Sequence, residues 1–260
     1  MLRPATAVAF LLGSLGFASL QGQRKDEIRE RFLALDAKRD HAGIVELWKD
    51  APARALPTID EDLEGFLALV EKGGDSKEIE KMKERALRGA KAADQAFQHP
   101  IFSDYTSSYV GWNAEQQKQF RAGQQASGAA MQALQKKDFA AAKKEAQRSI
   151  DLARPLGDWW GASSGYGALG AAEEGLGNKE AALDAYQQAR VLHHDLNFFD
   201  QEIRDETAMA RLLLDLGRTV RAGVVLQQAT QRAESRKNEK ALAAIAELRK
   251  RLPESGAGNK

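Results

Sequence analysis

The stretch that decides the fold is LGAAEEGLGNKEAALDAYQQA, residues 169–189. Small and apolar side chains recur in it at spacings of three and four, which is the period of a helix. Gly177-Asn178 interrupts this pattern, and Asn178 can cap a second helix because its side chain accepts a hydrogen bond from the backbone of the following turn. The stretch therefore predicts a helix, a tight turn and a second helix.

The pattern returns forty residues before and after this turn. Residues 137–142 (KDFAAA), 177–182 (GNKEAA) and 217–222 (GRTVRA) align, and their last residues are Ala142, Ala182 and Ala222. Small side chains at equal intervals allow successive helical hairpins to pack closely against one another. We infer an internal repeat of forty residues.

The middle unit resembles a tetratricopeptide repeat. Leu169, Gly170, Ala182, Tyr186 and Ala189 stand at the spacings of that family's signature. The period of forty exceeds the family's usual length of about 34, so either the helices are about a turn longer or the loops are extended.

The two flanking units resemble the family less closely. Ala130 and Ala210 stand where Gly170 stands in the middle unit, and no large aromatic residue matches Tyr186. A bundle of helices without a repeat is the alternative interpretation. The resemblance covers roughly residues 123–235, with a capping helix near 238–252.

The resemblance implies an all-α fold in which antiparallel hairpins stack as a superhelix, an α-solenoid. In that family the first helices line a concave groove that binds peptides or partner proteins, although fold alone does not fix function. On this model the groove would present Gln124, Ser127, Ser164, Glu174, Arg204, Thr207 and Arg211.

Two of these residues suggest a chemistry for the groove. Arg204 and Arg211 lie two turns apart on one expected helix and could hold a carboxylate through paired hydrogen bonds. The alternative is that both are solvated and paired with Asp205 or Asp215.

The rest of the chain is also expected to be helical, since nearly every segment after Arg24 has helical spacing. Residues 24–112 form an N-terminal helical region, which either contains degenerate repeats or separate hairpins, and residues 253–260 form a disordered tail. Helices are expected near 25–38, 42–50, 58–72, 76–97, 114–136, 139–153, 158–176, 179–194, 200–216, 219–235 and 238–252.

Residues 97–112, FQHPIFSDYTSSYVGW, differ from the rest of the chain. The segment combines Pro100 with serines and threonines, and we expect it to be a long non-helical loop. Such loops are often functional, so the loop either packs into the core or binds a ligand. Its aromatic candidates are Phe102, Tyr105, Tyr109 and Trp112.

Residues 1–23 have the features of a secretory signal peptide. Arg3 precedes an uncharged apolar stretch from Ala5 to Leu20, which is shorter than the roughly 20 apolar residues of a membrane-spanning helix. We expect an exported protein, periplasmic or secreted and bacterial, without a stable membrane span once the leader is removed. An uncleaved N-terminal membrane anchor is the alternative.

Composition excludes several classes of protein. The 260 residues include 38 basic and 37 acidic side chains and no cysteine. A net charge near zero argues against a dedicated nucleic-acid binder, which needs a positive surface. Without cysteine the chain has no disulfide, thiol catalysis or zinc–cysteine site.

Two short motifs have simpler explanations than cofactor or metal binding. Residues 165–170, GYGALG, match a dinucleotide fingerprint, but the strand that this fingerprint requires is absent. These glycines would allow close approach of either a neighbouring helix or a bound peptide. His193 and His194 are adjacent on a helix and do not share a face, so we expect no metal.

No nucleophile motif, phosphate loop or paired-carboxylate pattern supports an enzyme, and we expect no catalytic residue and no cofactor. The sequence favours an exported repeat protein that binds a protein or peptide as an adaptor or assembly scaffold. The alternative is an exported helical binder of a small molecule or glycan that uses residues 97–112.

Overall fold

A computed structural model of the chain describes residues 27–253, and their regular secondary structure is entirely helical. The all-α prediction is therefore confirmed. The chain divides into two compact units, the first ending at Thr106 and the second beginning at Ser107. The expected leader, residues 1–23, and residues 254–260 of the expected tail lie outside the described residues.

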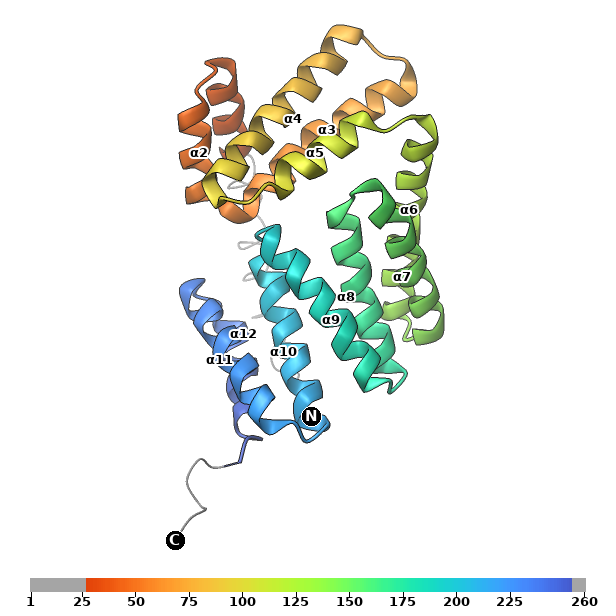
Figure 1. Cartoon of the computed structure of the whole chain (residues 1–260), viewed down its shortest axis with the longest axis vertical. Helices are drawn as coiled ribbons and strands as arrows, with labels where there is room; N and C mark the ends of the chain where they lie inside the picture. Colours follow the sequence, from red (N-terminus) through yellow and green to blue (C-terminus); the bar gives the residue numbers. More distant parts are fainter. Residues whose placement is uncertain (1–26, 254–260) are drawn as a thin grey trace, which may run out of the picture. The chain divides into compact units, whose positions relative to one another are not determined.

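The first unit is built from helices of unequal length (Figure 1). Helix α4 packs against both α2 and α3, and Trp48 donates a hydrogen bond of 3.0 Å from Nε1 to the carbonyl of Gly89 in the core. The helical segments are residues 27–37, α2 (His41–Asp50), a 3₁₀ turn (Pro52–Arg54), α3 (Ala55–Lys72), α4 (Ser76–Phe97) and α5 (Ile101–Gly111), which continues into the second unit.

The second unit is a series of helical hairpins in which each helix packs against the next (Figure 1). In addition, α6 contacts α8 and α10 contacts α12. The helices are α6 (Ala114–Gln135), α7 (Phe139–Ala153), α8 (Trp159–Gly175), α9 (Lys179–Asp195), α10 (Phe199–Asp215), α11 (Thr219–Ser235) and α12 (Glu239–Arg249), with a 3₁₀ turn at Arg154–Leu156. Apart from α5, the helix bounds given above differ from the expected ones by no more than three residues.

One turn geometry joins all of these hairpins. Before each helix from α7 to α12, one residue has a positive φ, and the next backbone N–H donates to a carbonyl five residues earlier, as Asn178 does to Glu173 at 2.9 Å. These left-handed residues stand at intervals of twenty: Lys137, Gly157, Gly177, Asn197, Gly217 and Lys237.

The equal turns explain the forty-residue period. Helices α8, α9, α10 and α11 each contain 17 residues, and three residues separate each from the next. The helices are thus long and the loops short, which decides between the two explanations of the period. The first unit has three turns with these hydrogen bonds, at Arg39, Gly73 and Gln98, but they do not keep the interval.

Small residues lie at the closest contacts between the helices of each hairpin. Ala142, Ala182 and Ala222 are all fully buried, so the three aligned positions are equally shielded from solvent. Gly170 lies against the ring of Tyr186, and an added Cβ would stand 2.8 Å from the ring carbon Cδ1. The close approach of α8 and α9 therefore requires glycine at this position.

The expectation of a non-helical loop over residues 97–112 is wrong, because residues 101–111 form helix α5. Pro100 ends α4 but can precede a new helix, since a proline ring fits the start of a helix. The carboxylate of Asp94 accepts hydrogen bonds from the backbone N–H groups of Phe102 (3.1 Å) and Ser103 (3.2 Å). A side chain of the preceding helix thus satisfies the first N–H groups of α5.

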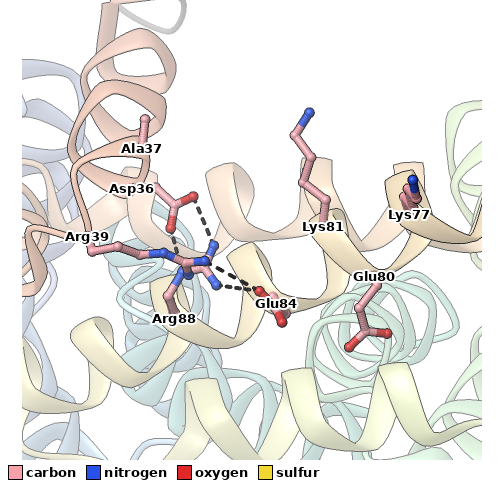
Figure 2. Close-up of a pocket in the computed structure, with 8 residues that line it drawn as sticks. All are labelled: Asp36, Ala37, Arg39, Lys77, Glu80, Lys81, Glu84 and Arg88. Atoms are coloured by element: carbon pink, nitrogen blue, oxygen red, sulfur yellow. Dashed lines mark hydrogen bonds and ion pairs between the residues drawn. The ribbon is translucent and has the colours of Figure 1, made fainter.

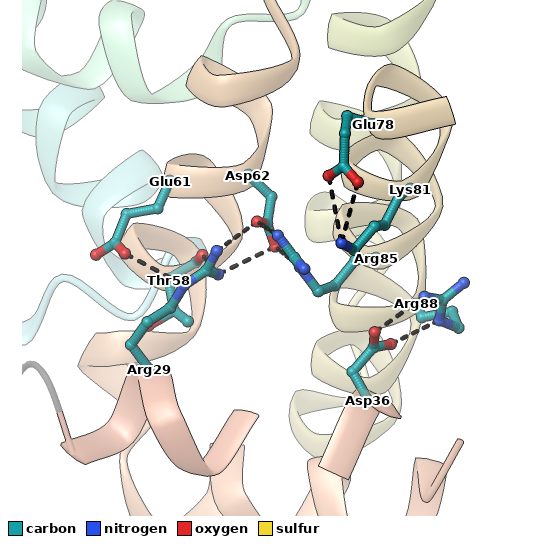
Figure 3. Close-up of polar contacts among 9 residues, drawn as sticks. All are labelled: Arg29, Asp36, Thr58, Glu61, Asp62, Glu78, Lys81, Arg85 and Arg88. Carbon is teal, nitrogen blue, oxygen red and sulfur yellow. Dashed lines mark hydrogen bonds and ion pairs between the residues drawn. The ribbon is translucent and has the colours of Figure 1, made fainter. Parts of the chain in front are cut away.

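A buried carboxylate links three helical segments of the first unit (Figure 3). Asp62 of α3 is fully buried. Arg29 donates to it from residues 27–37 (Nη1–Oδ2 3.0 Å), and Arg85 donates to it from α4 (Nε–Oδ2 2.8 Å). Both arginines also contact the second carboxylate oxygen, Oδ1. A buried charge of this kind is tolerated because it is fully hydrogen-bonded.

We predict that Asp62→Asn strongly destabilises the first unit, because two partly buried arginines lose the negative charge of the acid that they share. The expected loss in the free energy of unfolding is about 3 kcal/mol or more, measured by urea denaturation. Glu78→Gln is the control, because Glu78 forms only an exposed pair with Lys81 at 3.2 Å, and its loss should stay below about 1 kcal/mol. Similar losses for the two variants would contradict the role of Asp62.

We also predict opposite effects for two glycines of α8. Gly170→Ala should cost about 1–3 kcal/mol because the ring of Tyr186 must move. Gly167→Ala should stabilise by about 0.5–1 kcal/mol, because alanine favours a helix and its Cβ would meet no atom within 4 Å. Denaturant unfolding of both variants tests this, and changes of the same sign would refute it.

Candidate functional site

A groove of about 460 Å³ runs along the first helices of the hairpins in the second unit. It is lined by α6, α8 and α10 together with side chains of α9 such as His193. Pairs of lining residues stand forty positions apart, for example Ser164 with Arg204 and Met131 with Ala171. The repeat thus places equivalent positions on one surface.

The walls of the groove are largely apolar. Trp160 and Phe198 meet edge to face with their ring centroids 5.2 Å apart, and both rings line the groove. Met131 also lines it and remains 50% exposed, so its apolar surface is accessible to a ligand. A volume in this range suits a small ligand or a segment of peptide.

The glycines at the start of α8 separate into two kinds. An added Cβ at Gly165 would stand 2.7 Å from Ile150, and one at Gly161 would meet the capping carboxylate of Asp158. These two glycines serve packing and capping. Gly167 lines the groove, and a Cβ there would meet nothing within 4 Å.

The structure brings together only some of the expected groove residues. Ser127, Ser164 and Arg204 line the groove. Thr207 donates its hydroxyl hydrogen to the carbonyl of Ile203 on its own helix at 2.7 Å, and Gln124 accepts a hydrogen bond of 2.9 Å from Arg121.

The two remaining expected residues, Glu174 and Arg211, form an ion pair with each other. Their closest atoms, Arg211 Nη1 and Glu174 Oε1, are 2.5 Å apart. Arg211 is therefore already paired, and the alternative interpretation, in which it pairs with Asp205 or Asp215, is wrong for this residue. Asp215 instead pairs with Arg251 (Oδ1–Nη2 2.5 Å).

Arg204 differs from Arg211. It is exposed and lines the groove, and among residues 27–253 no side chain or carbonyl forms a hydrogen bond or ion pair with it. Its charge is available to a ligand. A carboxylate held by Arg204 and Arg211 together would first have to displace Glu174.

Asp205, beside Arg204, contacts a histidine of α9. His193 Nδ1 lies 2.6 Å from Asp205 Oδ2, and both residues line the groove. Burial raises the pKa of Asp205 above its ordinary value, opposed by the hydrogen bond to His193.

Sequence reasoning missed Trp160, Phe198 and His193 as groove residues. Gly167 stands forty residues after Ser127, and this spacing could have identified Gly167 as a groove residue. The contact of His193 with Asp205 across the turn between α9 and α10 carries no comparable signal in the sequence.

The four aromatic candidates lie in the interior. Phe102, Tyr105, Tyr109 and Trp112 are each no more than 6% exposed. Tyr109 stacks on Trp112 with ring centroids 4.3 Å apart, and Trp112 Nε1 donates to the carbonyl of Leu156 at 3.0 Å. A ligand could reach these rings only by displacing core contacts.

Another hollow, in the first unit, is lined by charged side chains (Figure 2). Arg88 donates to Asp36 (Nε–Oδ1 2.7 Å) and contacts Glu84 at 3.1 Å. Arg39 lies 3.7 Å from Glu84. Because these charges neutralise one another, the hollow offers a ligand less than the groove does.

A row of buried acids lies on another face of α10. Glu202 and Glu206 are fully buried, and Arg232 of α11 contacts both, each at 2.8 Å. Arg190 of α9 lies 3.9 Å from Glu206. The second oxygens, Glu202 Oε2 and Glu206 Oε2, have no hydrogen-bond partner within residues 27–253. Burial raises the pKa of Glu206 to about 7, although Arg232 opposes the shift.

We predict that this acid makes the protein less stable at alkaline pH. Because the folded-state pKa lies above the ordinary 4.5, the contribution of Glu206 to stability is full below about pH 4.5 and is lost as the pH rises through about 7. The difference in unfolding free energy between pH 5.5 and pH 8 should shrink in Glu206→Gln.

Glu180→Gln provides the control, because Glu180 is exposed on α9 and pairs with Arg218 at 2.6 Å. Its pH dependence should match that of the wild type. If Glu206→Gln has the same pH dependence as the wild type, Glu206 is not the cause of the loss of stability at alkaline pH.

Within the described part of the chain, no three histidine, aspartate or glutamate side chains are grouped as metal ligands would be. None of the helices in residues 27–253 is both long and apolar enough to cross a membrane.

Comparison with known proteins gives no family assignment. No family model matches the chain, and no curated protein sequence matches it.

Proposed function

We propose that the second unit is a peptide-binding module of the tetratricopeptide-repeat type and that the protein is an exported adaptor or assembly scaffold. The stacked hairpins, the small residues at their contacts and the groove along their first helices support this proposal. The apolar stretch after Arg3 in the leader supports export.

The open space over Gly167 is the observation on which this proposal rests. A glycine in the middle of a helix costs about 1 kcal/mol relative to alanine, and no neighbouring atom within 4 Å requires it there. Glycine allows another backbone to approach a helix closely. A peptide lying over α8 would use that space.

The lining indicates the chemistry of the peptide. Trp160, Phe198 and Met131 offer apolar contacts, and Arg204 offers a positive charge that forms no hydrogen bond or ion pair within residues 27–253. An acidic group beside apolar residues complements this surface, because opposite charge adds specificity and speeds association. We therefore propose that the ligand is a peptide segment with an acidic group next to apolar residues. The burial of Phe102, Tyr105, Tyr109 and Trp112 leaves no observation that favours a second function.

The test is selection of random peptides by display on the full chain, followed by affinity measurement with fluorescence anisotropy. Selected peptides should carry an acidic residue next to apolar ones. Arg204→Glu should weaken binding about tenfold or more, because an attractive charge becomes repulsive. Gly167→Trp should block binding by filling the groove.

Matched controls separate these effects from general ones. Arg221 is an exposed arginine of α11 outside the groove, and Gly128 of α6 also has no atom within 4 Å of an added Cβ. Arg221→Glu and Gly128→Trp should bind like the wild type. Equal losses in the controls, or no loss in the groove variants, would contradict the proposed function.

A further inference from the structure

The groove contains a histidine that is held in one orientation. His193 Nδ1 lies 2.6 Å from Asp205 Oδ2, and the two residues are only 6% and 5% exposed. His193 comes from α9, a second helix of the hairpins, yet its ring reaches the groove between the first helices.

The contact with Asp205 determines whether the other ring nitrogen, Nε2, donates or accepts a hydrogen bond. A carboxylate accepts a hydrogen bond, so Nδ1 carries the hydrogen, and in a neutral imidazole Nε2 is then an acceptor. A carboxylate that orients an imidazole in this way is a common means of fixing its tautomer.

The other ring nitrogen, Nε2, forms no hydrogen bond within residues 27–253 and is not among the fully buried polar atoms that lack a partner. Because His193 lines the groove, we infer that Nε2 is open to it. Phe198 lies beside His193 with its ring centroid 6.2 Å away, and the low exposure of His193 strengthens a hydrogen bond formed by its ring.

We propose that His193 Nε2 accepts a hydrogen bond from a main-chain N–H of the bound peptide, and that Asp205 is the positioning residue for this contact. The inference rests on the proposed function and adds how the peptide is recognised. The missing side chain at Gly167 lets the peptide backbone come close to α8, and main-chain N–H groups are present whatever the peptide sequence. Arg204 then binds the acidic group of the peptide, while His193 binds the peptide backbone.

The experiment uses peptides obtained by random display selection on the full chain. Each peptide is synthesised with one main-chain N–H at a time replaced by N-methyl, and its affinity is measured by fluorescence anisotropy. At one position the replacement should weaken binding to the wild type about tenfold, because a polar atom in the groove loses its partner.

Two variants show whether His193 is that partner. His193→Phe combined with Asp205→Leu removes both buried polar groups, which is tolerated better than leaving one unpaired, and thermal unfolding checks that it folds. In this double variant the N-methyl effect should disappear. In His193→Gln it should persist, because the amide can donate to Asp205 and still offer an oxygen to the peptide.

Four results would overturn the inference. The first is an N-methyl effect that is the same at every position, and the second is one that survives unchanged in the double variant. The third, selection of no peptide by the wild type, would contradict the proposed function and this inference with it. Peptides that bind without the N-methyl effect would contradict this inference alone.

Discussion

The turn with one left-handed residue, repeated every twenty residues, is the constraint on which the second unit depends. It ends one helix and starts the next with the same backbone hydrogen bonds each time. Because the turns are equivalent, successive helices run back and forth in register, and α8 to α11 have equal lengths. Each hairpin then presents the same helix positions to its neighbour, and Ala142, Ala182 and Ala222 are buried for this reason.

Close packing and the groove are two consequences of that register. Gly170 and the buried alanines bring helices together, whereas Gly167, three residues from Gly170 on the same helix, faces open space. A glycine of the first kind stabilises the fold, and one of the second kind lowers stability unless a ligand uses the space. The two roles cannot be told apart from residue type, since both residues are glycines of α8.

Local signals in the sequence were sufficient to predict the helices and most of their bounds. The interruption at Gly177-Asn178 indicated where α9 begins, but the prediction that the Asn178 side chain caps this helix is wrong, because that side chain instead donates to Glu173 at 2.7 Å. Helix α5 was missed because Pro100 and the following serines and threonines are typical of loops. Its aromatic residues at 102, 105, 109 and 112 nevertheless have helical spacing.

The site was less predictable because its contacts join distant helices. Lys137, Asn197 and Lys237 adopt the left-handed conformation in which glycine is usual, so sequence alone did not show that every turn is alike. The pairing of Arg211 with Glu174 and of His193 with Asp205 depends on how neighbouring helices pack. Ser127, Ser164 and Arg204 were found from the repeat, whereas the apolar walls and the histidine came from the structure.

The most direct test of this account is a crystal structure of the full chain with a selected peptide bound. We predict peptide backbone over Gly167, between α6, α8 and α10, with an acidic group beside Arg204. Peptide density on the exposed faces of α7, α9 and α11, with the groove left empty, would contradict it.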